Sequence, residues 1–309
     1  MTISHAISNI QRYRKRYGLS KAFRAIIHYL YVASNKTRVK SPKIDTIEVN
    51  GYKLQVMIND PLGTSSELLM FRKHEPVTTE IVSKTLQKGM ICLDIGGNIG
   101  YYVLLESKIV ENEGRVVAIE PSPENFRYLM NNLQLSKTSN VEAFNIAVGN
   151  VEGTTNFLIY KGASNSGMVI QEGQKPAWPG TIIQVPIRTI DSLLTDMGLK
   201  KIDFVRMDVE GYEDRVIDGM KNTLQSSKPI IQIEMHASIM GNENTKKLLN
   251  RLQQIGYDVK YYVPRDIDTP LIGTMKDVKH YNIEKILSML EDQTLPSFIM
   301  LTLENHNRV

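Results

Sequence analysis

The sequence predicts an α/β fold in which a mostly parallel sheet carries helices on both faces. Three observations predict it. Short apolar runs typical of buried strands alternate with amphipathic segments typical of helices through most of the 309 residues. The first of these runs, 90–95, leads directly into a glycine-rich turn. The second ends in an acidic residue, Glu120, and this layout is typical of a nucleoside-binding crevice.

The individual elements follow from local pattern. Apolar runs predict seven strands, near 90–95, 115–120, 141–147, 201–208, 229–235, 258–262 and 296–303. Helical periodicity predicts helices near 99–110, 123–135, 190–197, 212–225 and 243–255. The last strand lies far from the strand before it, so it could insert antiparallel. Ligands of such sheets bind beyond the carboxyl ends of the strands.

Two further regions flank or interrupt this alternation. Asn50-Gly51 between alternating apolar residues predicts a β-hairpin within 45–59, and a loop then leads to a helix over 76–87. Between 150 and 188, two strand-like runs at 155–160 and 181–187 flank a Gly/Ser-rich loop and Trp178. This insertion predicts a hairpin with a long tip, under which an acceptor could enter.

The chain divides into an N-terminal part, 1–70, and a main domain, 71–309. Ten of the 37 lysines and arginines precede Asp45, whereas no acidic residue does. Residues 5–34 have the spacing of basic, aromatic, amphipathic helices, so 5–43 could contact an anionic membrane peripherally. The same helix could instead pack on the core or on a second subunit. Nucleic acid is disfavoured because the remaining chain is acidic.

The single cysteine, Cys92, falls within a predicted strand, so we expect a buried packing residue and no internal disulfide. A reducing, cytoplasmic setting fits this usage. Arginines from Arg12 to Arg16 interrupt any apolar signal sequence, and no run is long and apolar enough to span a bilayer. The expected location is therefore cytoplasmic, with the membrane surface as an alternative.

The glycine-rich turn reads Asp94-Ile95-Gly96-Gly97-Asn98-Ile99-Gly100. A dinucleotide fingerprint would need glycine at Asn98 and at the residue after Gly100, so NAD is disfavoured. The pattern instead fits S-adenosylmethionine. Asp94 could meet the ammonium group of the methionine moiety, the glycines allow close approach of the backbone, and Glu120 could accept hydrogen bonds from two ribose hydroxyls.

Two other strand ends carry candidate catalytic residues. Asp208 and Glu210 follow the run 201–208 and share a face by the period of two, although Glu210 could simply cap the next helix. Glu234 and His236 end the neighbouring run, and His236 is the natural general base for an alcohol acceptor. Alternatively His236 packs in the core, and the strand end forms a structural ion pair between Glu234 and Arg206. A divalent ion could bridge Asp208, Glu234 and His236, but we predict no metal.

Together these motifs resemble the FkbM family of S-adenosylmethionine-dependent methyltransferases. The matching stretches lie within 71–236 and are 74–78, 93–100, 118–123, 131–133, 145–148, 188–193, 202–211 and 233–234. The resemblance implies a class I methyltransferase fold and methylation of an oxygen, often on a sugar or a polyketide-derived alcohol. The family usually has lysine at Arg206, so a catalytic amine there is doubtful, and a structural or substrate-orienting role is favoured.

The expected function is therefore O-methylation of a sugar or lipid-linked glycan. Alternatives are a methyltransferase of a small secondary metabolite or lipid head group, and a binding protein that keeps the fold without activity. The expected catalytic residues are His236, Asp208 and Glu234. The residues expected at the cofactor are Glu75, Thr78, Asp94, Gly96, Gly97, Asn98, Gly100, Glu120, Ser122, Asn145, Ala147 and Asp208.

Overall fold

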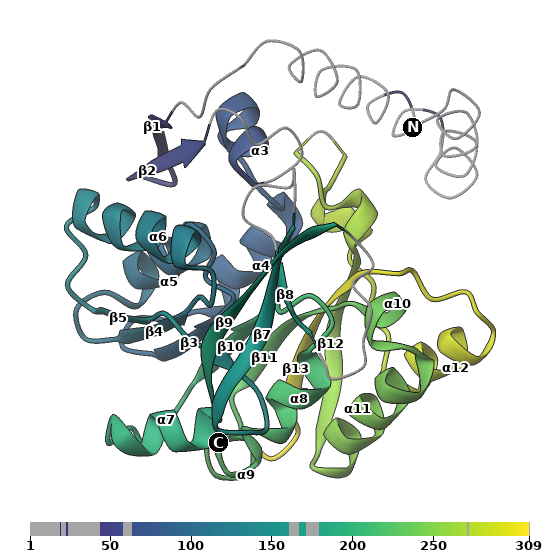
Figure 1. The fold of residues 1–309 in the computed structure, drawn as a ribbon. Coiled ribbons are helices and arrows are strands. Elements are labelled where there is room, and N and C mark those ends of the chain that lie inside the picture. The colour runs from purple at the N-terminus through teal and green to yellow at the C-terminus, as the bar shows by residue number, and fades with distance from the viewer. Residues whose placement is uncertain are drawn as a thin grey trace.

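The computed structural model describes residues 19, 23, 44–57, 64–160, 167–170, 179–270 and 272–308 (Figure 1). The helix expected over 5–34 and the linker that follows it lie almost wholly outside the described residues. The tip of the insertion, 161–166, and Trp178 also lie outside them.

The centre of the fold is a seven-stranded sheet in the order β12-β13-β11-β10-β3-β4-β5. Neighbouring strands are parallel except around β13, which is antiparallel to both β11 and β12. The mostly parallel sheet and the antiparallel last strand are thus confirmed. The strands are β3 (Ile91–Ile95), β4 (Arg115–Ile119), β5 (Val141–Phe144), β10 (Phe204–Met207), β11 (Ile230–Met235), β12 (Tyr257–Pro264) and β13 (Ile299–Asn305).

Helices cover both faces of this sheet (Figure 1). Successive strand residues bury on opposite sides: Cys92 packs in one hydrophobic cluster and Leu93 in another. The first cluster includes residues of α4 (Pro76–Thr85), α5 (Tyr101–Val110) and α6 (Pro123–Leu135). The second includes residues of α7 (Ile190–Asp196), α8 (Glu213–Asp218), α9 (Lys221–Ser227), α11 (Asn242–Gln254) and α12 (Ile283–Glu291).

The expected hairpin is present as β1 (Ile44–Val49) and β2 (Tyr52–Met57). Asn50 and Gly51 form its turn with φ of 52° and 75°, which favours these residue types. Ile47 and Leu54 bury in the same cluster as α5 and α6, so the hairpin packs onto the main body. The division of the chain at residue 70 stays a prediction.

The insertion forms a second sheet rather than a hairpin alone. Its order is β6-β9-β7-β8, built from β6 (Ala147–Val148), β7 (Gly153–Tyr160), β8 (Gly167–Ile170) and β9 (Gly180–Arg188). The expected antiparallel pair is present as β7 and β9. The sequence predicted a loop for the whole tip of this hairpin, and that prediction is wrong in part. Residues Gly167–Ile170 form a strand because their backbone pairs with the free edge of β7.

Two expected elements are shorter than predicted. The strand over 141–147 ends at Phe144, and Ala147–Val148 joins the second sheet instead. The helix over 212–225 breaks into α8 and α9 at Gly219. There the backbones nearly touch, since a Cβ on Gly219 would lie 1.8 Å from the Gly149 oxygen. This close approach shows that tertiary contact overrides the local helical pattern.

Four short elements complete the part of the chain that the structure describes: α3 (Thr64–Phe71), α10 (Ala237–Met240), and the 3-10 turns η1 (Arg265–Ile267) and η2 (Met275–Asp277). Of the helices in the described ranges, none has the length and apolarity needed to cross a membrane.

Candidate active site

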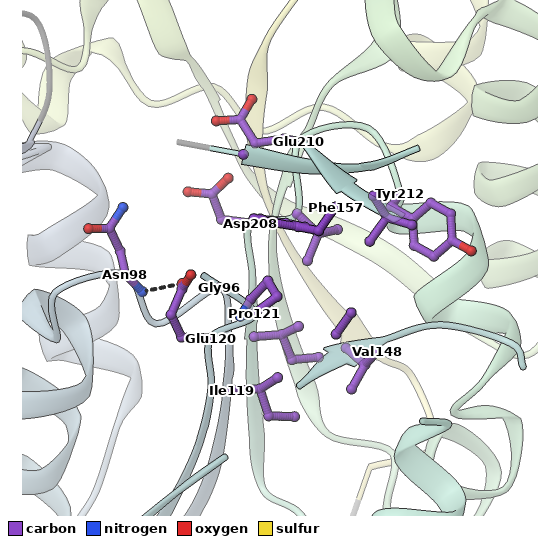
Figure 2. Close-up of a pocket in the computed structure, with 15 residues that line it drawn as sticks. Gly96, Asn98, Ile119, Glu120, Pro121, Val148, Phe157, Asp208, Glu210 and Tyr212 are labelled. Carbon is purple, nitrogen blue, oxygen red and sulfur yellow. Dashed lines mark hydrogen bonds between the residues drawn. The ribbon is translucent and has the colours of Figure 1, made fainter. Parts of the chain in front are cut away.

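A cavity of about 590 Å³, which includes space open to solvent, lies at the carboxyl ends of β3, β4 and β10 (Figure 2). Ligands of open α/β sheets bind at this position. The lining residues come from the glycine-rich turn, from the ends of the three strands and from the second sheet. They are Ile95, Gly96, Asn98, Ile119, Glu120, Pro121, Ala147, Val148, Phe157, Gly167, Val169, Asp208, Val209, Glu210 and Tyr212.

The glycine-rich turn forms the floor of this cavity. Gly96 has a φ of 87°, a conformation that L-residues rarely adopt. A Cβ there would lie 2.0 Å from the backbone oxygen of Asp208, so only glycine fits between β3 and β10. Asn98 has a φ of 50°, and its backbone N–H points at Glu120. The turn thereby brings backbone donors to the cavity floor.

Glu120 is held in place by backbone N–H groups. Its Oε2 accepts from Asn98 N at 2.9 Å (Figure 2), and its Oε1 accepts from Ser122 N at 2.8 Å. Burial raises the pKa of Glu120 to about 7, although the Ser122 and Asn98 N–H groups act in the opposite direction. Oε1 also accepts from Asn125 Nδ2 at 3.4 Å, so Oε2 is the oxygen that keeps lone-pair capacity for a further donor, such as a ribose hydroxyl.

The opposite wall of the cavity is apolar. Phe157 and Val169 come from β7 and β8 of the second sheet, and Val148 comes from β6. Sequence reasoning missed these residues. The alternation of apolar residues in the insertion was a usable signal for strands, but nothing local indicated that their buried face would meet the cavity.

Arg206 links the cofactor side of the cavity to the strand end at Asp208. Its Nη1 lies 3.4 Å from Asp94 Oδ1, its Nη2 lies 3.4 Å from Asp208 Oδ2, and the guanidinium lies 4.0 Å from the centre of the Tyr102 ring. Asp94 is fully buried, which raises its pKa to about 6, while Arg206 opposes the rise. The expected structural role of Arg206 agrees with this position.

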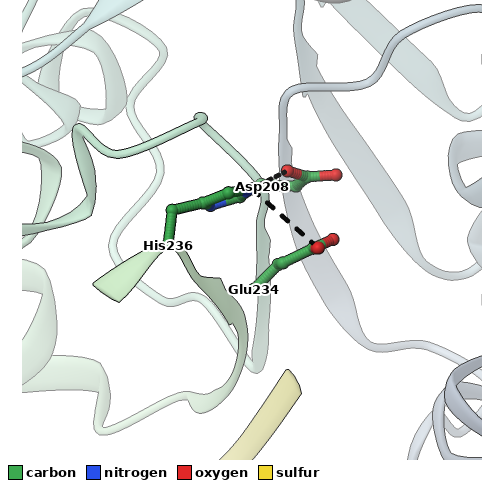
Figure 3. A group of neighbouring side chains, drawn as sticks. All are labelled: Asp208, Glu234 and His236. Atoms are coloured by element: carbon green, nitrogen blue, oxygen red, sulfur yellow. Dashed lines mark ion pairs between the residues drawn. The ribbon is translucent and has the colours of Figure 1, made fainter. Parts of the chain in front are cut away.

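A second cluster of polar side chains lies beside the cavity, at the ends of β10 and β11. Asp208, Glu234 and His236 point toward one another (Figure 3). His236 Nε2 lies 3.9 Å from Asp208 Oδ1, 3.9 Å from Glu234 Oε1 and 3.4 Å from Glu210 Oε2. Asp208 and Glu210 line the cavity as well, so the two groups of residues share one border.

His236 is oriented from behind by Glu213, a carboxylate with no exposed surface. Nδ1 of His236 lies 2.6 Å from Glu213 Oε1. Burial disfavours the charged imidazole, but Glu213, Glu234 and Glu210 outweigh it and raise the pKa of His236 well above 6.5. Burial also raises the pKa of Glu234 to about 8 and of Glu210 to about 7. Glu234 and Glu210 therefore retain their protons to higher pH than exposed carboxyl groups do.

Arg265 connects this cluster to the start of α4. Its Nε lies 3.1 Å from Glu234 Oε1 and its Nη2 lies 2.6 Å from Glu75 Oε1. Glu75 also contacts His74 Nε2 and the Tyr102 hydroxyl. Burial raises the pKa of Glu75, but Arg265 and His74 outweigh it and hold that pKa well below its usual value. Sequence reasoning missed Arg265, because no motif surrounds it.

The structure separates the residues expected at the cofactor into two groups. Gly96, Asn98, Glu120, Ala147 and Asp208 line the cavity. The others are not among its described lining residues; they are Glu75, Thr78, Asp94, Gly97, Gly100, Ser122 and Asn145.

Several residues of the second group hold the frame instead. The side-chain amide of Asn145 donates to the backbone carbonyl oxygens of Glu120 and Pro121, and Ser122 caps α6. Thr78 donates its backbone N–H to Asp268 at the start of α4.

The sheet order, with an antiparallel strand inserted near one edge, and the glycine-rich turn facing an acidic strand end define a class I S-adenosylmethionine-dependent methyltransferase. The pattern of the methyltransferase FkbM domain matches residues 94–259, more than half of the chain. The chain therefore belongs to the FkbM methyltransferase family, and the expected family resemblance is confirmed.

Individual relatives are distant. The chain is 26% identical over 249 residues to the hexuronic acid methyltransferase AglP of Haloferax volcanii, covering 76% of this chain and 93% of the relative. It is 22% identical over 143 residues to methyltransferase 1 of Beauveria bassiana, covering 41% of this chain and 57% of the relative. A solved FkbM methyltransferase from Methylobacillus flagellatus is 18% identical with a TM-score of 0.37, over 53% of this chain and 38% of that one.

Proposed function

We propose that this protein transfers the methyl group of S-adenosylmethionine to a hydroxyl of a sugar or of a lipid-linked glycan. One observation carries the proposal. A cavity suited to a nucleoside adjoins a cluster of acidic and imidazole side chains, and Asp208 belongs to both. Cofactor and acceptor would thus meet at the end of β10.

The cofactor site would use both walls of the cavity. Glu120 would accept from the ribose hydroxyls, since its oxygens are already aligned by two backbone donors. The adenine would lie against Phe157, Val169 and Ile119. Asp94 has no exposed surface and does not line the cavity, so its assignment to the methionine ammonium group stays a prediction from the sequence. When bound, S-adenosylmethionine supplies a methyl group on a positively charged sulfur.

The cluster of Asp208, Glu234 and His236 would bind and deprotonate the acceptor. The acceptor oxygen forms a bond to the methyl carbon as the carbon–sulfur bond breaks, and the hydroxyl proton passes to a group of the cluster. His236 is protonated near neutral pH when Glu213 and the other carboxylates surround it, so a carboxylate is then the proton acceptor. Burial raises the pKa of Glu234 to about 8, so this carboxyl would already hold a proton at pH 7, whereas the pKa of Glu210, raised to about 7, suits proton exchange near neutral pH.

The acceptor class is supported by the relative from Haloferax volcanii, whose name describes methylation of a hexuronic acid. The ten basic residues before Asp45 support a lipid-linked form of the glycan, because basic segments bind anionic membrane surfaces. A secondary metabolite or lipid head group remains the alternative acceptor.

Calorimetric titration with S-adenosylhomocysteine tests the cofactor assignment. Wild type is expected to bind in the micromolar range, and Glu120→Ala is expected to lose binding. Glu124→Ala removes an exposed carboxylate from the first turn of α6 and is the matched control, expected to bind like wild type. Absence of binding by folded wild type would contradict the proposal.

Labelled methyl donor then tests the acceptor. Glucuronic acid glycosides, neutral glycosides and lipid-linked glycans are compared at equal concentration. Methyl transfer to sugars by wild type, together with its loss in Asp208→Asn, would support the role of the cluster. Transfer only to lipid head groups or small alcohols would replace the glycan assignment with the alternative.

A further inference from the structure

His236 is held with one ring nitrogen facing a group of carboxylates. Its Nδ1 contacts buried Glu213 at 2.6 Å, which fixes the plane of the ring. Its Nε2 therefore points toward Asp208, Glu210 and Glu234. A histidine that binds a metal ion almost always donates its other ring N–H to a carboxylate in this way.

The distances around Nε2 are long for direct contacts. Hydrogen bonds between charged groups measure about 2.7–2.9 Å, whereas Nε2 lies 3.4–3.9 Å from the three carboxylate oxygens. Two ligand atoms that each lie about 2.1 Å from one ion are about 3–4 Å apart over the usual coordination angles. One oxygen each from Asp208 and Glu234 and one nitrogen of His236 all lie within 4.8 Å of one another. The spacing suits ligands of a shared ion.

The charges lead to the same conclusion. Asp208, Glu210, Glu213 and Glu234 place four carboxyl groups around one imidazole. The two nearby arginines are already shared with other buried carboxylates, Arg206 with Asp94 and Arg265 with Glu75. Glu213 and Glu234 are buried, and the side chains of Asp208 and Glu210 are 25% and 29% exposed. Grouping these carboxylates is unfavourable unless a cation compensates them.

We propose that Asp208, Glu234 and His236 bind a divalent transition-metal cation, with Glu210 at its border and Glu213 as the positioning residue behind His236. One imidazole and two carboxylates form a ligand set that suits ions such as Mn²⁺, Fe²⁺ or Zn²⁺. The cation would lie at the edge of the cofactor cavity through Asp208. The cation would take the place of the proton on His236 Nε2, and its use in the reaction, holding the acceptor oxygen and favouring its ionised form, rests on the proposed function.

Mn²⁺ binding to the full chain provides the test. Free Mn²⁺ is followed by electron paramagnetic resonance during titration, with and without S-adenosylhomocysteine. One saturable Mn²⁺ per chain below millimolar concentration is expected in at least one of the two conditions. Absence of a saturable site in both conditions, with folded wild type, would overturn the proposal.

Variants locate the site. Glu234→Gln is expected to abolish saturable binding, and Glu213→Gln to weaken it by about 10–100-fold because it acts only through His236. Glu142→Gln removes one negative charge from an exposed side chain of β5 and should leave Mn²⁺ affinity unchanged. Asp208→Asn, at a partly exposed ligand, replaces Glu234→Gln if that buried substitution prevents folding. Unchanged affinity in both folded ligand variants would place the ion elsewhere and overturn the proposal.

Titration of the same sample with S-adenosylhomocysteine separates the two proposals. Binding of S-adenosylhomocysteine without any Mn²⁺ site would overturn the cation site and leave the methyltransferase assignment standing. Binding of Mn²⁺ that Glu234→Gln abolishes, without binding of S-adenosylhomocysteine, would support the cation site and contradict the proposed cofactor site.

Discussion

The two halves of the candidate site are built by different means. On the cofactor side, Glu120 is fixed by backbone N–H groups of residues 22 and 2 positions away, at 2.9 and 2.8 Å. On the acceptor side, side chains hold one another, and Arg265 meets Glu75 across 190 positions of sequence. The first half depends on the shape of one turn. The second depends on the balance of buried charges brought together by the whole fold.

This difference predicts how each half responds to substitution. Backbone donors survive a change of side chain, so the cofactor half should fail only where the turn itself is distorted or where Glu120 is altered. A network of buried charges loses compensation whenever one member is removed. The predictions below run from the largest expected effect to the smallest.

Arg206→Met should break the link between the halves. Asp94 has no exposed surface and would lose its cationic partner, so the free energy of unfolding should fall by about 3–5 kcal/mol. Chemical denaturation measures this loss. Arg188→Met, which removes exposed ion pairs to Glu152 and Asp196, should cost less than about 1 kcal/mol. Equal losses in the two variants would show that Arg206 is not specially stabilising.

Gly96→Ala should distort the turn. The new Cβ would lie 2.0 Å from the Asp208 oxygen at a φ of 87°, so the free energy of unfolding should fall by about 2–4 kcal/mol, with loss of S-adenosylhomocysteine binding. Gly198→Ala is the control: its φ is 65°, but no atom lies within 4 Å of the new Cβ. It should cost about 1 kcal/mol by backbone strain alone and bind S-adenosylhomocysteine normally.

Cofactor affinity should depend on the protonation of Glu120. Burial raises the pKa of Glu120 to about 7, and in the proposed complex the ionised form would accept the ribose hydroxyls. Affinity for S-adenosylhomocysteine should therefore be about tenfold weaker at pH 6 than at pH 8, as measured by calorimetry. Glu120→Gln should bind more weakly and with little dependence on pH over this range.

Unfolding at pH 6 does not explain this loss of affinity, because protonation of Glu120 stabilises the folded state. A carboxyl whose pKa is raised from 4.5 to about 7 on folding binds its proton more tightly in the folded state. Its contribution to stability is therefore largest below pH 4.5 and is lost between pH 4.5 and 7. A melting temperature that fell at pH 6 together with affinity would count against Glu120 as the titrating group.

Ser122→Ala should have the smallest effect and separates side chain from backbone. Ser122 Oγ caps α6, so its loss should cost about 1 kcal/mol of unfolding free energy. Its backbone N–H, which holds Glu120, remains, so affinity for S-adenosylhomocysteine should not change. Ser83→Ala, an exposed serine inside α4, should change stability by less than about 0.5 kcal/mol. A large loss of affinity in Ser122→Ala would mean that the side chain contributes to the cofactor site.

Local pattern was enough for the central sheet and for the polar floor of the cavity, but not for its apolar wall. Apolar runs predicted the strands, and the glycine-rich turn placed Gly96, Asn98 and Glu120 at one cavity. The sequence also contains a pattern typical of a helix start at α12, because Asn282 can cap the helix and Ile283, Ile286 and Leu290 follow at helical spacing. That helix could have been predicted from the sequence.

The acceptor half could be predicted only in part. Asp208, Glu234 and His236 follow from strand ends, because parallel strands bring their carboxyl ends to one edge. The partners that set their charge, Arg265 and Glu213, come from a turn after β12 and from α8. No short-range pattern specifies which side chains from separate elements meet, since topology decides it.

The second sheet has one consequence for how such a site could diversify. Ala147 and Ile187 are paired neighbours in β6 and β9, and Gly149 N donates to Arg188 O at 2.9 Å. The chain therefore leaves and rejoins the main body at nearly the same point. Since closure entropy changes slowly with loop length, the connections within 150–186 could change in length with little strain on the central sheet, provided that the core side chains Phe157, Val169 and Val185 are kept or replaced by residues that fill the same space. Changes in residues 150–186 would alter the wall of the cavity formed by Phe157 and Val169 and would leave the glycine-rich turn unchanged.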